Sequence, residues 1–172
     1  FTSLGSIKTT KVSQDAAIVT AGDTLFIIGG SRANTNQYDK TNYLDTIEIF
    51  DLKNLKTIQP TPALKLSKPR TSAQAITVNG KIFVIGGADE SVNSGDPTSK
   101  IVDIINVKNL ILENTFTLTN GSRRAALQAL GDTVFILGGE KYLNQPTPDI
   151  RIIDAQVQMQ RTTPSNFNLS RG

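Results

Sequence analysis

The chain has 172 residues and a formal net charge of +3, and it contains neither cysteine nor histidine. Without those residues it has no thiolate nucleophile, no imidazole base and no usual ligand for zinc or copper. Thiol, serine–histidine and copper chemistry are therefore excluded, and no cofactor is expected. The basic and acidic residues are interspersed, so the charge does not indicate nucleic acid as a partner. No apolar run approaches the roughly 18 residues that a membrane span needs.

The first part of the chain contains four predicted strands. Residues 16–20 are small and β-branched, and a Gly-containing turn leads from them into the apolar run LFIIGG at 25–30. A long polar loop follows, and then apolar and polar residues alternate with period two over 46–52. A less regular segment at 55–61 completes the unit. No segment has a convincing helical period, so we expect an all-β fold.

The same order of parts recurs twice more, marked by the apolar runs IFVIGG and VFILGG. Such self-similarity is the signature of a repeat architecture. The corresponding predicted strands are 72–78, 82–87, 101–107 and 110–118 in the second unit, and 125–130, 134–139, 149–155 and 157–163 in the third.

Each unit is expected to form a four-stranded antiparallel sheet that is apolar on both faces near its middle. Such a sheet must be covered on both sides by its neighbours, as a blade is in a β-propeller. The paired glycines then have a reason. At the end of an inner strand, two glycines let a neighbouring backbone pass close by and permit a sharp exit into the loop.

At these residues the sequence resembles kelch repeats, which form β-propellers. The matching elements are the four apolar residues followed by Gly-Gly in each unit, and the apolar–Asp/Asn pairs Phe50-Asp51, Ile105-Asn106 and Ile153-Asp154. The family usually has a tryptophan shortly after the second element and a tyrosine within it, whereas this chain has no tryptophan and has Phe50, Ile105 and Ile153 in the tyrosine position. Those residues pack between blades in the family, so the resemblance implies an apolar replacement.

The resemblance implies three blades, and a closed propeller usually has roughly four to eight. Both ends resemble parts of further units, so we expect more blades in the native ring. In the alternative, two copies of this chain meet to close one ring. The expected divisions are an outer strand of a preceding blade with its connector at 1–13, blades at 14–70, 71–122 and 123–167, and the start of a further blade at 168–172.

In such blades the loops between strands two and three emerge on the same face as the connectors from strand four to the next blade. Here those loops are long, at 31–45, 88–100 and 140–148, whereas the opposite turns are short. Long loops on a rigid scaffold usually carry binding. The candidate binding residues on this face are Arg32, Tyr38, Lys40, Lys68, Arg70, Arg123, Arg124, Lys141 and Tyr142.

Two interpretations of these residues stay open. Arginine and tyrosine are efficient contact residues, so the face could bind an acidic peptide or protein. Alternatively it is a solvated rim, with Arg70 and Arg124 tied to loop carbonyls. The resemblance favours a protein-binding scaffold without catalytic residues. The alternative function is carbohydrate-related, either glycan binding or a sugar-modifying enzyme without copper, with Asp89, Glu90 or Glu140 as candidate carboxylates.

Overall fold

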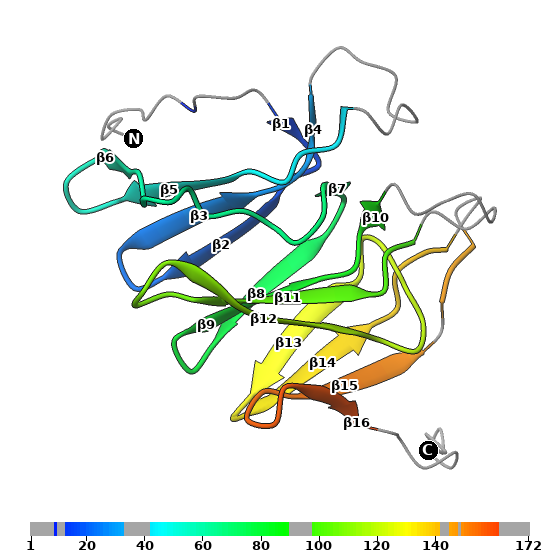
Figure 1. Ribbon diagram of the computed structural model, residues 1–172. Helices are drawn as coiled ribbons and strands as arrows, with labels where there is room; N and C mark the ends of the chain where they lie inside the picture. The colour runs from blue at the N-terminus through cyan, green and yellow to red at the C-terminus, as the bar shows by residue number, and fades with distance from the viewer. Residues whose placement is uncertain are drawn as a thin grey trace, which may run out of the picture.

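The regular elements of the computed structural model are all β-strands. The structure describes residues 9, 13–32, 42–89, 98–141, 145–147 and 149–161. Within them, three four-stranded antiparallel sheets follow one another along the chain and lie side by side (Figure 1). No helix in these ranges is long and apolar enough to cross a membrane. The predicted all-β fold with propeller-type blades is confirmed.

Each sheet is a simple meander, and each is called a blade below. The first blade contains β2 (Ala17–Ala21), β3 (Thr24–Ile28), β5 (Ile47–Asp51) and β6 (Lys56–Ile58). The second contains β8 (Gln74–Val78), β9 (Lys81–Ile85), β11 (Ile101–Asn106) and β12 (Ile111–Thr117), and the third contains β13 (Ala126–Leu130), β14 (Thr133–Leu137), β15 (Ile150–Asp154) and β16 (Met159–Arg161).

The described residues contain two more short antiparallel pairs. One joins β1 (Ser13–Gln14) to β4 (Ser31–Arg32), and the other joins β7 (Arg70–Thr71) to β10 (Ala88–Asp89). The chain segments predicted to belong to neighbouring blades, 1–13 and 168–172, lie almost wholly outside the described residues.

Two apolar cores lie between neighbouring blades rather than within one. Phe26, Ile28 and Ile49 of the first blade pack with Ile82 and Val84 of the second. On the other side of the second blade, Phe83 and Ile104 pack with Ile136 and Ile153 of the third. Because alternate residues of β9 enter different cores, the inner strand of a blade has to be apolar throughout. This explains the uninterrupted apolar runs in the sequence.

The paired glycines lie where a connector passes closest to a blade. Gly29 has a φ of 63°, in the left-handed region, and a Cβ placed on it would lie 2.6 Å from the carbonyl oxygen of Arg70. Gly30 is equally confined, since its Cβ would lie 2.6 Å from the carbonyl oxygen of Gln14. No side chain fits at either position. The predicted reason for the glycine pairs is confirmed.

The aspartates and asparagines of the kelch-like pairs cap the hairpin between the third and fourth strands. In the first blade, Asp51 Oδ1 accepts hydrogen bonds from the backbone N–H groups of Lys53 at 2.9 Å and Asn54 at 3.0 Å. The side-chain hydrogen bond from Asn54 and these backbone bonds lower the pKa of Asp51. Asn106 and Asp154 cap the equivalent turns. These residues therefore have a local structural role.

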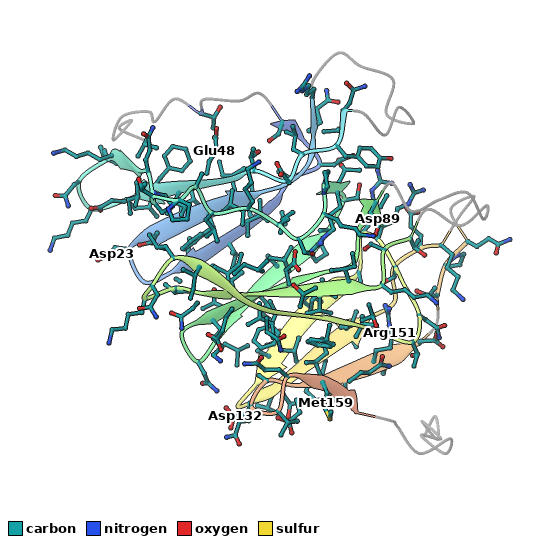
Figure 2. All side chains as sticks on the ribbon, viewed as in Figure 1. Asp23, Glu48, Asp89, Asp132, Arg151 and Met159 are labelled. Carbon is teal, nitrogen blue, oxygen red and sulfur yellow. The ribbon has the colours of Figure 1, made fainter. Side chains whose placement is uncertain are left out.

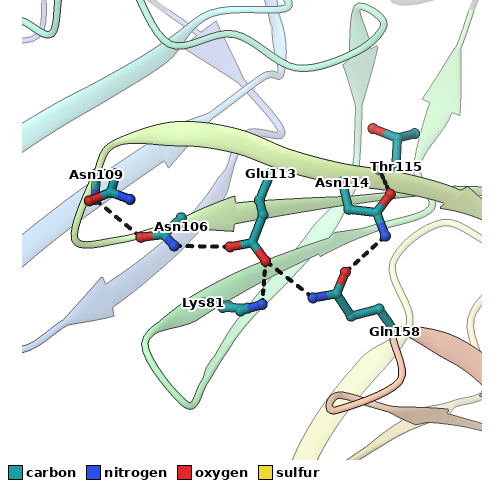
Figure 3. Close-up of polar contacts among 7 residues, drawn as sticks. All are labelled: Lys81, Asn106, Asn109, Glu113, Asn114, Thr115 and Gln158. Carbon is teal, nitrogen blue, oxygen red and sulfur yellow. Dashed lines mark hydrogen bonds and ion pairs between the residues drawn. The ribbon is translucent and has the colours of Figure 1, made fainter.

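A polar network joins the second and third blades on the side of the short turns (Figure 3). Glu113 of β12 accepts hydrogen bonds from Lys81, from Asn106 at 2.9 Å and from Gln158 of the third blade at 3.3 Å. Gln158 also accepts a hydrogen bond of 2.8 Å from Asn114. The hydrogen bonds from Lys81 and Asn106 lower the pKa of Glu113.

Candidate functional site

The loops between strands two and three and the connectors between blades share one face of the molecule. β1 pairs with β4 and β7 pairs with β10, and each of these pairs joins a connector to the start of a loop. In the third blade, a bridge between Arg123 and Glu140 makes the same join. Figure 1 shows the β2–β3, β8–β9 and β13–β14 hairpins on the opposite side. This face is called the loop face below.

Each loop is held at its base by an equivalent backbone hydrogen bond. Leu44 N–H donates to the carbonyl of Gly30 at 2.9 Å, and Ser99 N–H donates to that of Gly87 at 2.7 Å. In the third blade, Thr147 N–H donates to Gly139 at 2.9 Å. The second glycine of every pair therefore supports the loop that follows it, so all three loops rise from fixed positions.

Connector side chains form an ion-pair cluster on the loop face. Glu140 forms an ion pair of 3.0 Å with Arg123 Nε and accepts a hydrogen bond of 2.8 Å from Arg124, which also lies 3.5 Å from Asp15. The cluster links the connector that leads into the first blade, through Asp15, with the connector that leads into the third blade, through Arg124. Because Glu140 and Asp15 offset the two guanidinium charges, the loop face is less basic than its arginines alone indicate.

Tyr43 connects this cluster with the second blade. It is half-buried, and burial is the main reason that the pKa of its hydroxyl is raised. The carboxylate of Asp89 raises this pKa further and the guanidinium of Arg123 lowers it, so both charges act on the tyrosine. Charges from the second and third blades therefore act on a tyrosine from the loop of the first blade, and Asp89 is labelled in Figure 2.

Arg70 does not lie on the surface. Its side chain is 0% exposed and forms a 3.0 Å ion pair with Asp103 of β11, which is also fully buried. Arg70 Nη2 donates to the carbonyl of Val84 at 3.3 Å, while Asp103 accepts from Ser67 N–H at 2.9 Å and from Thr115 at 2.7 Å. Burial lowers the pKa of Arg70, and the charge of Asp103 opposes this shift. The prediction that Arg70 contacts a partner is wrong, because it ties a connector to the blade.

The third blade contains a second buried guanidinium that the sequence analysis did not identify. Arg151 of β15 occupies the strand position of Asp103, and Ser122 occupies the connector position of Arg70. Arg151 donates to the carbonyls of Asn120 at 2.9 Å and Gly138 at 3.2 Å, and also to Ser122 Oγ (Figure 2). Burial lowers its pKa. The sequence did contain a sign of this buried guanidinium, because a charged residue stands between Ile150 and Ile152 in a predicted strand.

The remaining candidate residues differ in exposure. Arg32, Lys68 and Arg124 are exposed, while Arg123 and Lys141 are half-buried. Tyr38, Lys40 and Tyr142 lie outside the described residues, as does the candidate carboxylate Glu90. Among the residues that the structure describes, no group of three acidic side chains could hold a metal ion.

Comparison with known proteins agrees with this geometry. The family model of the kelch motif matches residues 14–56, which include all four strands of the first blade. This match supports a kelch-repeat family. It is also similar to alpha-scruin of Limulus polyphemus, with 29% identity over 124 residues, or 72% of this chain. That match spans only 13% of the length of alpha-scruin.

Kelch repeats commonly form propeller elements that bind other proteins, and neither match favours the carbohydrate alternative.

Proposed function

We propose that this kelch-repeat chain binds a protein or peptide partner through its loop face. The observation that carries the proposal is the asymmetry between the two sides. Three long loops rise from hydrogen-bonded bases on one side, whereas short hairpins connect the strands on the other. A rigid scaffold that presents several adjustable loops together is the usual arrangement for recognition.

The proposed partner is acidic where it meets the connectors. Lys68 is exposed in the connector into the second blade and forms no ion pair with a described residue. Lys141 lies at the start of the third loop, and its backbone N–H donates a hydrogen bond of 2.8 Å to the carbonyl of Gln145. Arg123 and Arg124 also carry positive charge, but their acidic neighbours partly offset it. The two lysines are therefore expected to dominate the electrostatic attraction of the acidic partner.

A random peptide display library selected on the chain tests the proposal. We expect the enriched peptides to be acidic. The double variant Lys68→Glu, Lys141→Glu should weaken their binding about ten-fold, because exposed charge pairs contribute several tenths of a kcal/mol each and reversal turns attraction into repulsion. The matched control is Lys53→Glu, Lys108→Glu, which makes the same charge change in exposed hairpins of the opposite side.

The control variant should bind like the original chain. Equal loss of binding in both variants would indicate a general charge effect, and undiminished binding in the Lys68, Lys141 variant would contradict the proposed face. We also propose that further blades, either from the same chain or from a second copy, complete the ring.

A further inference from the structure

The dipeptide Asn-Gly occurs twice in the chain, and the structure places the two copies in different surroundings. Asn79-Gly80 forms the turn between β8 and β9, and Asn120-Gly121 lies in the connector between the second and third blades. The dipeptide is chemically reactive, because the backbone nitrogen of glycine can attack the side-chain amide of the preceding asparagine. Glycine has no Cβ to hinder this attack. Which copy reacts therefore depends on the freedom of the peptide group between the two residues.

Asn79 and Gly80 are exposed and border open space. Their φ values of 50° and 71° are those of a two-residue hairpin turn. A Cβ placed on Gly80 would meet no atom of the described residues within 4 Å. Val107 N–H donates to the carbonyl of Gly80 at 3.0 Å, but that carbonyl belongs to the peptide group after the glycine. The nitrogen of Gly80 can therefore approach the side chain of Asn79 without displacing a neighbouring segment.

Asn120 and Gly121 are held in place on both sides. The carbonyl of Asn120 accepts a hydrogen bond of 2.9 Å from the buried guanidinium of Arg151. Gly121 is buried, and a Cβ placed on it would lie 2.7 Å from the carbonyl oxygens of Thr98 and Ser99. Rotation of the peptide group between Asn120 and Gly121 would break a hydrogen bond of a buried charge and press the chain against these carbonyls. The fold therefore protects this second copy.

The side chain of Asn79 links the second blade to the third. Its Nδ2 donates a hydrogen bond to Asp132 in the β13–β14 turn, which is labelled in Figure 2. The other carboxylate oxygen of Asp132 accepts a hydrogen bond from Gln156. Glycine takes the place of Asn79 in the other two blades, as Gly22 and Gly131. A carboxylate in place of the Asn79 amide would remove the donor and bring a second negative charge against Asp132.

We propose that Asn79 is a site of spontaneous deamidation and that its product loosens the contact between the second and third blades. The nitrogen of Gly80 forms a bond to Cγ of Asn79, the C–N bond of the side-chain amide breaks, and ammonia leaves with the proton of the attacking nitrogen. Water then opens the resulting ring and leaves aspartate or isoaspartate. The inference goes beyond the proposed function, because this turn lies on the side opposite the loop face.

Incubation of the folded chain in mildly alkaline buffer, with the chain unfolded in guanidinium chloride as the matched control, tests the proposal. Peptide mapping by mass spectrometry gives the rate of deamidation at each asparagine. The two rates should be similar in the unfolded chain, because the reacting dipeptide is the same. In the folded chain Asn79 should react at least about ten-fold faster than Asn120, because local opening is easiest in exposed turns. Equal rates, a faster Asn120 or an unreacted Asn79 in the folded chain would overturn the proposal.

Asn79→Asp reproduces the charge of the product and tests its effect on the blades. Its urea midpoint should be lower than that of the original chain. Asn79→Asp, Asp132→Asn should regain most of the loss, because the amide and the carboxylate then exchange places. Asn109→Asp is the control, since it makes the same charge change in an exposed turn of the same blade. Unchanged stability of Asn79→Asp, an equal loss in Asn109→Asp, or no recovery in the double variant would contradict the loosened contact.

Discussion

Arg70 in the connector and Asp103 in β11 form an ion pair of 3.0 Å, and both side chains are fully buried from solvent. Asp103 also fixes the connector through Ser67 N–H and the outer strand through Thr115. One carboxylate of β11 therefore holds both the connector and the adjacent outer strand β12. The ion pair therefore anchors the connector between the first and second blades to the sheet of the second blade.

Removal of Asp103 alone should be strongly destabilising. In Asp103→Ala, the guanidinium of Arg70 stays buried without its counter-charge, and Ser67 N–H and Thr115 lose their acceptor. We expect the free energy of unfolding to fall by about 3–5 kcal/mol, as for other broken buried pairs. Urea denaturation followed by circular dichroism measures this change. The double variant Arg70→Met, Asp103→Leu should lose less than Asp103→Ala, and a larger loss would contradict the account.

Ser122→Arg should place two guanidinium groups in the space that Arg151 alone fills. We expect a loss of about 3 kcal/mol or more, since like charges would be buried without a carboxylate. Adding Arg151→Asp recreates the arrangement of Arg70 with Asp103 and should recover much of the stability. A double-mutant cycle by denaturant unfolding gives the coupling energy. Additive effects of the two substitutions would show that the positions are not equivalent.

Gly29→Ala should cost more stability than Gly22→Ala. The two glycines have similar φ values of 63° and 57°, so alanine pays a similar left-handed backbone cost of about 1–2 kcal/mol at both. At Gly29 the new Cβ would also lie 2.6 Å from the carbonyl oxygen of Arg70, whereas nothing lies within 4 Å of the Cβ at Gly22. Thermal unfolding of both variants isolates the clash. Equal losses would contradict the proposed close passage of the connector.

Glu113→Gln should make stability less dependent on pH in the acid range. The folded-state pKa of Glu113 is lowered by hydrogen bonds from Lys81 and Asn106, so its contribution is present above the unfolded-state pKa of about 4.3 and is lost as the pH falls through the lower folded value. The free energies of unfolding of the original chain and the variant, measured between about pH 6 and pH 2, give this pH dependence. The variant should be less stable at the upper end, and the difference should shrink towards the lower end.

Local sequence patterns predicted the strands, the glycine contacts and the side that carries the loops. Those features depend on neighbouring residues and on the repeat, so they can be read without the fold. The burial of Arg70 could not be predicted, because its partner Asp103 belongs to a different strand and only tertiary packing brings them together. Glu48, Asp103 and Arg151 each interrupt an apolar strand at the same register position, and that pattern was the available sign of a polar layer between blades.

Hydrogen exchange of the chain with and without a selected acidic peptide tests the central claim most directly, because it locates the bound surface without any substitution. The account predicts that protection increases in the connectors, around Lys68 and around Arg123 and Arg124, and at the bases of the long loops. Protection confined to the β5–β6 and β11–β12 hairpins would place the peptide on the opposite side and would contradict the account.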